Sequence, residues 1–478
     1  MKQLLRKIYN FSVKNGLKVY LVGGYLRDLL IKRNNRDKKE WDLDFAIEKN
    51  AIKFGKKLAS ELKAGFVVLD KEHGCCRLVK RAKEKLFTLD FTDFRGKDIV
   101  EDLFHRDFTI NALAIDLKDF LKNKDKENFF IDPFGAKNDL KNKILRLVNR
   151  DSFLEDPLRI LRLFSFSAIL GFRIDKKMIF LIRRQRKLIA QVSAERIRDE
   201  LFKILDLDNS YPYIEMMDNL KILELIIPQI NRMRRVYQGP YHHLDVFSHS
   251  LETLKQLEKL MAEYKNNLDL ASYLEELLAA NRKRRSLIKL AAFLHDIGKP
   301  QAKFWQGGKV KFHGHERIGQ RLCEEIGRHL KLSNTEIEML KTTVLWHLRP
   351  GYLAGLDTLT ARAKFRFFRD AGKEAVSVLL VSLADQRSTR GPLTTKESRK
   401  RHKRIVKSLI NEYFKKQKEK PMKRLINGDD LINIFKLEPS PLFGKILKKI
   451  DELQAIGKIN TKKDALKWVE VFLRHNKI

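Results

Sequence analysis

The stretch that most constrains the fold runs from Val19 to Ile47, where two strand-like segments flank a glycine turn. Residues 19–22 are apolar and include Val and Tyr, which is typical of a strand. Gly23-Gly24 follows, and a helix is expected directly after it. Glycines at such a turn let the backbone approach a phosphate closely, and a helix start offers free N–H groups to an anion. We therefore expect a phosphate-binding strand–turn–helix unit.

The second segment, residues 42–47, alternates between polar and apolar side chains. On a strand, alternation places Asp42 and Asp44 on one face and Leu43 and Phe45 on the other. Two carboxylates beside a phosphate-binding turn suit paired Mg²⁺ ions that bridge an attacking hydroxyl and a nucleoside triphosphate. Paired aspartates are often only solvated surface charge, but their order and spacing after the glycine turn favour a metal site.

The combination Gly23-Gly24-x-x-Arg27-Asp28 with Asp42-x-Asp44 resembles the signature of the bacterial class II tRNA nucleotidyltransferase and poly(A) polymerase family, which is polymerase-beta-like. The resemblance implies an α+β head on a small mixed sheet. It also implies that Asp42 and Asp44 bind Mg²⁺ and that Gly23, Gly24 and Arg27 cradle the triphosphate. Asp90, on another alternating segment, is either a third catalytic carboxylate that deprotonates the attacking hydroxyl or an exposed strand position.

A further match to this family begins at Arg106-Asp107. The resemblance puts Asp107 at the ribose hydroxyl and Arg106 near the nucleotide. A carboxylate accepts a hydrogen bond from a 2′-OH and so favours ribonucleotides. Asp107 also suits the N-cap of an amphipathic helix, and the two roles are compatible.

Residues 153–172 predict a helix with an apolar face made of Leu158, Leu161, Phe164 and Ala168. Asp156 and Pro157 have the pattern of an N-cap and a first helical residue. Asp156 and Arg159 are three residues apart, so their side chains are neighbours on a helix. An acceptor beside a donor fork complements N4 and N3 of cytosine or N6 and N1 of adenine, and it mismatches uracil and guanine.

The resemblance supports the same assignment, because the Glu-Asp-x-x-Arg motif of this family selects CTP and ATP without a nucleic-acid template. Here the motif is Glu155, Asp156 and Arg159, with Arg162 one turn later as a phosphate or base contact. The helix expected over residues 193–201 matches a supporting motif that braces the nucleotide-selecting helix through charge pairs.

Beyond Gln238-Gly239-Pro240 the pattern becomes all-helical and resembles the HD metal-dependent phosphohydrolases. The resemblance implies that six residues hold one or two divalent transition-metal ions and activate water: His249, His295, Asp296, His315, His347 and Asp385. His313 competes with His315 for one ligand position, whereas His242, His243 and His329 are expected not to be ligands.

The chain has 98 Lys and Arg residues against 61 Asp and Glu residues, a formal net charge of +37. This excess attracts polyanions, nucleic acid above all, although a generally lysine-rich composition would also produce it. Residues 396–424 are the most basic and are either a phosphate-contacting surface or a solvated helix. Three cysteines without a CxxC pair argue against a disulfide framework and fit a reducing cytoplasm. No apolar run is long enough to span a membrane.

Together these features predict four parts: a nucleotidyltransferase head over 1–148, a mostly all-α neck and body over 149–237, an all-α HD domain over 238–395 and a basic, helical RNA-binding tail over 396–478. The expected reaction is CMP and/or AMP addition to the tRNA 3′ end (CCA addition or repair) from CTP and ATP, with release of pyrophosphate. CC-only addition, A-only addition and poly(A) synthesis are alternatives. An HD-type nucleotide phosphohydrolase or alarmone enzyme, and a non-catalytic RNA-binding protein, are alternatives of other classes.

Overall fold

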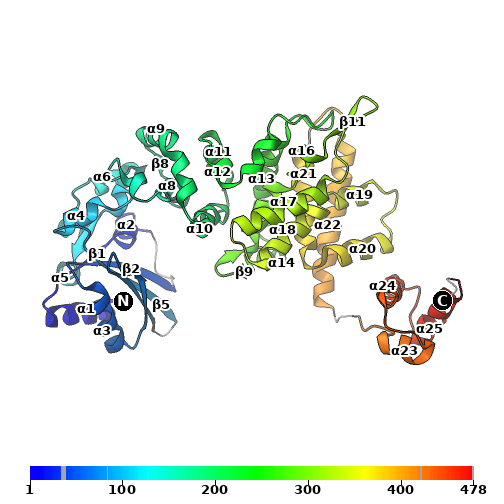
Figure 1. The fold of residues 1–478 in the computed structure, drawn as a ribbon, viewed down its shortest axis with the longest axis horizontal. Coiled ribbons are helices and arrows are strands. Elements are labelled where there is room, and N and C mark those ends of the chain that lie inside the picture. Colours follow the sequence, from blue (N-terminus) through cyan, green and yellow to red (C-terminus); the bar gives the residue numbers. More distant parts are fainter. Residues whose placement is uncertain (34–38, 83, 124, 420–421, 476–478) are drawn as a thin grey trace. The chain divides into compact units, whose positions relative to one another are not determined.

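The computed structural model describes residues 1–33, 39–82, 84–123, 125–419 and 422–475 (Figure 1). The chain folds into two compact units. The first comprises Met1–Ile204 and Asn219–Leu225, and the second comprises Leu205–Asp218 and Ile226–Ile478. The finer division into four parts stays a prediction, and residues 420, 421 and 476–478 of the expected tail lie outside the described residues.

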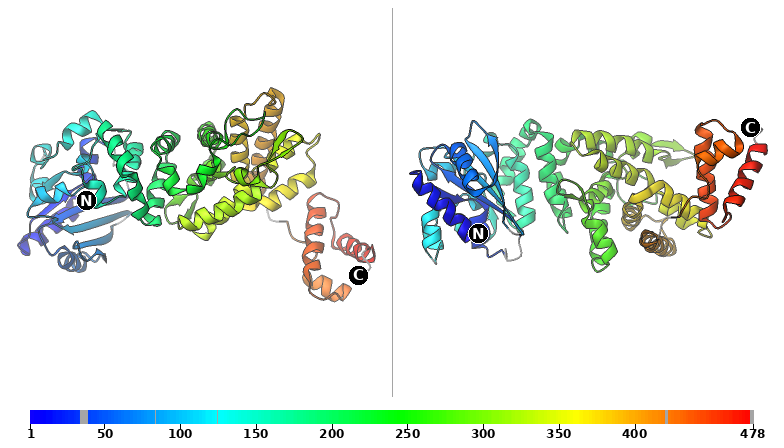
Figure 2. Two further views of the ribbon diagram at one scale, coloured as in Figure 1. Left: turned by 45° about the horizontal axis from the view of Figure 1, so that its top comes forward. Right: turned by 90° about the horizontal axis from the view of Figure 1, so that it is seen from below.

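The first unit is built on a six-stranded sheet with the order β3-β4-β5-β2-β1-β6. Among the described residues of this sheet, β2 and β5 pair in parallel and the other neighbouring strands pair antiparallel, so the sheet is mixed, as expected for the head. The strands are β1 (Val19–Val22), β2 (Glu40–Ile47), β3 (Gly65–Asp70), β4 (Cys75–Ala82), β5 (Lys85–Asp93) and β6 (Ala114–Asp116). Figure 2 shows this sheet from two further directions.

Helix α3 (Ala51–Leu62) covers the apolar face of the sheet, and α1 (Lys2–Lys14) adds Phe11 to the same core. Phe45 of β2 stacks on Phe91 of β5 with ring centroids 4.8 Å apart, and Phe54 of α3 lies 5.4 Å from Phe91. Such aromatic pairs contribute about 0.5–1.5 kcal/mol each beyond the area that they bury. Because Phe45 faces this core, the alternation predicted for β2 turns Asp42 and Asp44 to the opposite face.

The remaining elements of the first unit are mostly helices. They are α2 (Gly24–Leu30), α4 (Ile99–Phe104), η1 (Thr109–Asn111), α5 (Leu117–Lys122), η2 (Glu127–Phe129), α6 (Ala136–Asn142), β7 (Ile144–Leu145), α7 (Ser152–Glu155), α8 (Arg159–Leu170), β8 (Arg173–Ile174), α9 (Lys176–Gln185), η3 (Arg186–Gln191) and α10 (Ala194–Leu205).

Two local expectations hold only in part or not at all. The helix after Asp156 begins at Arg159 rather than at Pro157, although Oδ1 of Asp156 accepts a hydrogen bond from the Leu158 N–H at 3.2 Å, as an N-cap side chain does. The backbone of Asp156 is extended (φ −147°, ψ 100°), which is the conformation that a following proline imposes. Asp107 does not cap an amphipathic helix, since only the short 3₁₀ turn η1 follows it.

The second unit is nearly all helical. Its elements are α11 (Tyr211–Asn219), η4 (Pro228–Met233), α13 (Val246–Glu263), α14 (Leu268–Glu275), β9 (Leu277–Ala279), β10 (Arg282–Lys283), α15 (Arg284–Leu294), α16 (Lys299–Ala302), β11 (Phe304–Gln306), β12 (Lys309–Lys311), α17 (His315–His329), α18 (Asn334–Trp346), α19 (Arg349–Gly355), α20 (Ala361–Ala371), η5 (Gly372–Glu374), α21 (Ala375–Ser388), α22 (Lys396–Lys418), α23 (Gly428–Phe435), α24 (Pro441–Ala455) and α25 (Lys462–His475). The short helix α12 (Leu223–Ile226) lies mostly in the first unit.

The central helix of this unit is α21, whose residues 375–384 are all buried. It packs against α13, α15, α18 and α22, which explains why its sequence is apolar on every side. Helices α23, α24 and α25 enclose a separate small core around Leu431, Ile446 and Val469.

Candidate active site and metal cage

A cavity of about 360 Å³ in the first unit brings together all eight residues predicted to bind the nucleotide. They are Gly23, Gly24, Arg27, Arg106, Asp107, Asp156, Arg159 and Arg162. Asp44 also lines this cavity. A neighbouring cavity of about 710 Å³ contains Asp90 and shares five lining residues with the first: Asp44, Arg95, Arg106, Asp156 and Arg159. The two cavities therefore meet at a predicted metal-binding carboxylate.

The three predicted carboxylates lie on one face of the sheet. Asp44 and Asp90 are register partners in the parallel β2–β5 pair, and Asp42 lies two residues before Asp44 on the same strand. Burial raises the pKa of Asp44; Arg106 opposes the rise, while Asp90 and Asp42 add to it. A divalent cation would relieve this repulsion, so the carboxylate set fits Mg²⁺.

Asp90 has a second partner that the sequence did not indicate. Its two carboxylate oxygens accept hydrogen bonds from Nε and Nη2 of Arg77 on β4, at 2.8 and 2.7 Å. The role of Asp90 as a third catalytic carboxylate therefore stays a prediction.

Gly23 is required by the geometry of the turn. Its φ of +76° lies in a region that other residues rarely adopt. A Cβ atom there would lie 2.9 Å from Oδ2 of Asp44 and 3.1 Å from Nη1 of Arg106. The absence of a side chain lets the turn approach both groups closely.

A hydrogen-bonded chain crosses the floor of the nucleotide cavity. Nη1 of Arg27 donates to Oδ1 of Asn111 (2.7 Å), and Nδ2 of Asn111 donates to Oδ1 of Asp107 (3.0 Å). Oδ2 of Asp107 accepts from Nε of Arg162 at 2.9 Å. Burial opposes ionisation of Asp107, but the charge of Arg162 and the hydrogen bonds from Asn111 and the Phe108 N–H hold its pKa below the ordinary value. Asp107 is therefore a fixed anion.

Three cavity residues were missed by the sequence reasoning: Arg95, Asn111 and Phe166. The guanidinium groups of Arg27 and Arg162 each lie 5.3 Å from the ring centroid of Phe166. The spacing of Phe166 four residues after Arg162, on one helix face, was a usable signal. No pattern indicated Arg95.

Asp156 and Arg159 line the same cavity but are held by different partners. Oδ2 of Asp156 accepts from Nη2 of Arg196 on α10, at 2.8 Å. Arg159 donates to Oγ of Ser152 (2.6 Å) and Oε2 of Glu155 (2.9 Å). The contact with Arg196 supplies the charge-pair brace expected from residues 193–201. Base reading by Asp156 and Arg159 stays a prediction.

The six predicted HD residues meet inside the second unit, although they come from five helices or helix ends. Nε2 of His249 lies 2.9 Å from Oδ1 of Asp385, and Nε2 of His295 lies 3.1 Å from Oδ2 of Asp296. Nε2 of His315 and of His347 lie 3.3 and 3.7 Å from Oδ1 of Asp296. His313 is exposed, which leaves His315 in the ligand position.

The histidine rings of this cage are oriented for metal binding. Nδ1 of His295, His315 and His347 each bonds the carbonyl three residues earlier, at 2.8, 2.8 and 2.6 Å. This contact fixes the tautomer and leaves Nε2 as the free acceptor. Nε2 of all three rings and Oδ1 of Asp296 are buried without a hydrogen-bond partner, whereas Oδ2 of Asp296 lies beside the amine of Lys299. Such atoms are costly unless they coordinate a cation, so the cage fits a divalent metal.

Lys299 is an unexpected neighbour of the cage. Its amine lies 2.6 Å from Oδ2 of Asp296 and 2.7 Å from Oε1 of Gln238, which belongs to the segment between the expected neck and HD parts. Burial opposes ionisation of Asp296, but the charges of His295 and Lys299 hold its pKa well below the ordinary value.

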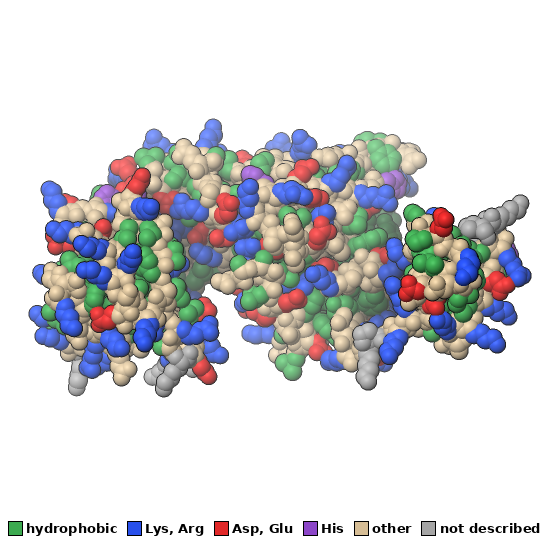
Figure 3. All heavy atoms as spheres, turned by 60° about the horizontal axis from the view of Figure 1, so that its bottom comes forward, with side chains coloured by type: hydrophobic (Ala, Val, Ile, Leu, Met, Phe, Trp, Pro, Cys, Tyr) green, Lys and Arg blue, Asp and Glu red, His purple; other side chains and the backbone are tan. Residues whose placement is uncertain are grey.

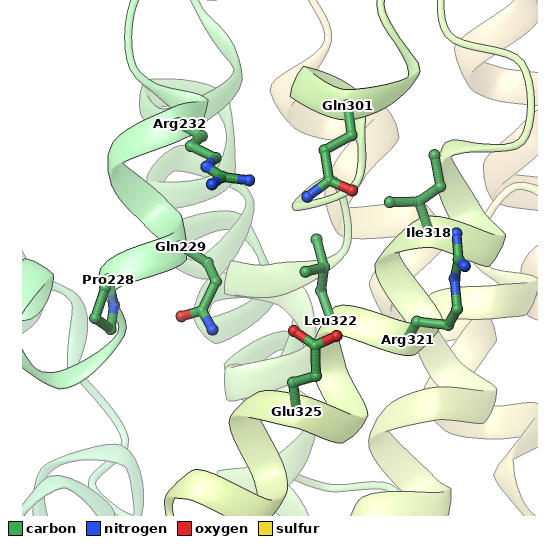
Figure 4. A pocket seen from close by; sticks show the side chains of 8 residues that line it. All are labelled: Pro228, Gln229, Arg232, Gln301, Ile318, Arg321, Leu322 and Glu325. Carbon is green, nitrogen blue, oxygen red and sulfur yellow. The ribbon is translucent and has the colours of Figure 1, made fainter.

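A further cavity of about 460 Å³ in the second unit contains none of the predicted residues. Figure 4 shows that Gln229 and Arg232 reach it from η4, Gln301 from α16, and Arg321 and Glu325 from α17. Positive and negative side chains are mixed there. Lys and Arg side chains are also spread over the face seen in Figure 3 rather than gathered at one place. In the described part of the chain, no helix has the length and apolarity needed to cross a membrane.

Family models match most of this architecture. They are the "Poly A polymerase head domain" over residues 19–146, the "Probable RNA and SrmB-binding site of polymerase A" over 171–233, the HD domain over 246–390 and the tRNA nucleotidyltransferase domain 2 over 322–469.

Similar proteins cover nearly the whole chain. An A-adding tRNA nucleotidyltransferase of Deinococcus radiodurans is 28% identical over 94% of this chain and 94% of its own length. A CC-adding tRNA nucleotidyltransferase of Thermus thermophilus is 26% identical over 93% of this chain and 91% of its own. The fold resembles a Thermotoga maritima CCA-adding enzyme solved with tRNA, with a TM-score of 0.62 at 23% identity over 98% of this chain and 95% of that one.

The head sheet with its clustered carboxylates, the nucleotide cavity and the histidine cage thus occur in the order of the matched domains. The chain therefore carries the head domain and the RNA-binding region of poly(A) polymerases together with an HD domain, and it is similar over nearly its whole length to tRNA nucleotidyltransferases.

Proposed function

We propose that this chain is a template-independent tRNA nucleotidyltransferase that adds CMP, AMP or both to the tRNA 3′ end from CTP and ATP, with Mg²⁺. The observation that carries the proposal is the convergence of eight predicted residues on one cavity that meets a second cavity at Asp44. The similarity to A-adding and CC-adding tRNA nucleotidyltransferases supports it. So do solved neighbours of like fold that hold tRNA, ATP or CTP.

The charges of the nucleotide cavity suit a triphosphate. Five guanidinium groups line it, from Arg27, Arg95, Arg106, Arg159 and Arg162, against three carboxylates. Guanidinium forks bind phosphate oxygens in pairs, so this surplus orients the polyphosphate for displacement of pyrophosphate. The open turn at Gly23 allows the phosphates to approach the backbone.

The sugar and the attacking hydroxyl are handled by carboxylates. Asp107, fixed as an anion, accepts from the ribose hydroxyl. Asp42 and Asp44 would hold Mg²⁺, which when bound neutralises the polyphosphate and acidifies the attacking hydroxyl. The tRNA 3′ end occupies the neighbouring cavity, where Asp90 lies beside Asp44 and accepts the proton of the 3′-OH.

The test is the double variant Asp42→Ala with Asp44→Ala. We expect incorporation of labelled CMP and AMP into tRNA to be abolished while the protein keeps its circular-dichroism spectrum. Intact incorporation by the folded variant would end the proposal.

The added nucleotides define the variant within this class. Supplying tRNA that ends before, within and after CC, with CTP and ATP separately, distinguishes full CCA addition from CC-only, A-only and poly(A) addition. One relative, at 28% identity, is A-adding and another, at 26%, is CC-adding. Similarity therefore does not choose among the four kinds of addition, and this assay does.

The HD cage supports a second activity, a metal-dependent phosphohydrolase. The buried, unpartnered Nε2 atoms of His295, His315 and His347 beside Asp296 favour it over a purely structural histidine cluster. A divalent transition metal is the proposed cofactor. A dedicated HD nucleotide hydrolase or alarmone enzyme is less consistent with this chain, because the head match at 19–146 precedes the HD match at 246–390.

We place both activities in the cytoplasm. Cys75, Cys76 and Cys323 are all free, which fits a reducing compartment.

A further inference from the structure

A third cavity of the first unit has a chemistry that the proposed reaction does not use. It has a volume of about 880 Å³ and is lined by residues of α1, α2 and α5 and of the segment after α5. It shares no lining residue with the nucleotide cavity or with the cavity beside Asp90. Its volume lies in the range of small-molecule sites in proteins.

The charge of this cavity is positive and uncompensated. Lys2 and Arg6 of α1 line it together with Lys122 of α5 and Lys126, and no carboxylate lines it. Among the described residues, no carboxylate forms an ion pair with any of these four cations. Burial, and then the charge of Lys2, lower the pKa of Lys126. Crowded cations of this kind are stabilised by a bound anion.

Aromatic rings form the other walls of the cavity. Tyr9, Tyr25 and Phe120 line it, and the rings of Tyr25 and Phe120 meet edge to face with centroids 6.1 Å apart. The amine of Lys126 lies 4.3 Å from the ring centroid of Phe120. Rings beside cations are the combination that binds a nucleobase together with its phosphates.

We propose that this cavity is a second nucleotide-binding site, which takes a free nucleoside polyphosphate independently of the catalytic cavity. The four cations bind the phosphates, and the base lies against Tyr9 and Tyr25. The ligand is a single nucleotide rather than an RNA strand, because the cations surround one cavity of nucleotide size. Tyr25 belongs to α2, which also carries Arg27 of the catalytic cavity, so one short helix borders both sites.

The first experiment counts ATP sites on the full chain by isothermal titration calorimetry. We expect the variant Arg6→Glu with Lys126→Glu to bind one ATP fewer per chain than the unchanged protein. The matched control is Lys7→Glu with Lys118→Glu, which makes the same change in net charge at exposed positions of α1 and α5 that do not line the cavity. The control should keep every ATP site, and thermal melting should show that both variants are folded.

The second experiment uses Lys126 as a chemical reporter in the unaltered protein. Acylation of Lys126 by an amine-reactive reagent, followed by mass spectrometry, should be blocked by ATP. ATP should protect at a concentration about tenfold or more below that of tripolyphosphate, because stacking adds to the phosphate contacts.

Several results would overturn the proposal. They are an unchanged number of ATP sites in the Arg6→Glu, Lys126→Glu variant, an equal loss in the control, equal protection by tripolyphosphate, and protection by an RNA oligonucleotide but not by ATP. The proposed tRNA reaction is assayed separately by nucleotide incorporation, so its failure would not be confused with failure of this site.

Discussion

Gly23 is the position where one added methyl group tests the geometry of the active site most directly. The change Gly23→Ala places a Cβ atom 2.9 Å from Oδ2 of Asp44 and 3.1 Å from Nη1 of Arg106. The backbone there has φ +76° and ψ −142°, which is strained for alanine by about 1–3 kcal/mol. Overpacking adds about 1–3 kcal/mol more, so the total cost is about 2–6 kcal/mol.

The expected consequence is loss of catalysis through displacement of Asp44. A shift of about 1 Å in a reacting group costs on the order of 100-fold in rate. We therefore expect kcat/KM for CTP and ATP incorporation to fall by at least about 100-fold in Gly23→Ala. Steady-state incorporation into tRNA measures this fall, and thermal melting reports the stability of the variant.

Gly135→Ala is the matched control, because it separates backbone strain from crowding. Gly135 also has a positive φ, +75°, but a Cβ atom there meets nothing within 4 Å. Its cost is therefore the strain alone, about 1–2 kcal/mol. We expect Gly135→Ala to lose some stability and to keep its kcat/KM. The reasoning would be refuted if Gly23→Ala were as active as Gly135→Ala.

Three further outcomes follow from the described contacts. Exchanging the charges at Asp156 and Arg159 should relax or invert discrimination against UTP and GTP in incorporation assays; unchanged selectivity would refute base reading by this pair. The pKa of Asp107 is lower in the folded protein than in the unfolded chain, where it is about 3.9. The resulting stability is fully present at a pH above the unfolded-state pKa, and it is lost as the pH falls through the folded-state pKa. Melting temperatures should therefore fall more steeply on acidification for the unchanged protein than for Asp107→Asn, and equal slopes would contradict the ion pair with Arg162. His295→Ala should abolish transition-metal binding, measured by equilibrium dialysis in excess Mg²⁺, and leave nucleotide incorporation intact; retained transition metal would remove His295 from the cage.

The sequence predicted those features that a local pattern determines. The period of two in β2 placed Asp42 and Asp44 opposite Phe45 because strand side chains alternate faces. The clustering of the HD residues was predicted from the resemblance alone. His249 and Asp385 are 136 residues apart, and no periodicity in the sequence relates them.

The missed features depend on tertiary contacts or on a single neighbouring residue. Asn111 bonds Arg27 across 84 residues, and no local pattern indicates that contact. Proline at 157 moved the start of α8 to Arg159 and left Asp156 in a turn, so the predicted shared helix face of Asp156 and Arg159 did not form.

This last difference changes the physical basis of the nucleotide selection that we propose for Asp156 and Arg159. Two residues on one helix turn would be aligned by the helix itself, whereas Asp156 depends on Arg196 of α10 and Arg159 on Ser152 and Glu155. An acceptor and a donor that are positioned by separate partners can be displaced separately. Loss of the Arg196 side chain would leave Asp156 with only the Leu158 N–H as a hydrogen-bond donor and would loosen Oδ2, the oxygen that we propose to read the amino group, while the guanidinium of Arg159 stayed fixed. We therefore expect the selectivity proposed for this pair to depend on the Asp156–Arg196 ion pair as well as on the motif itself.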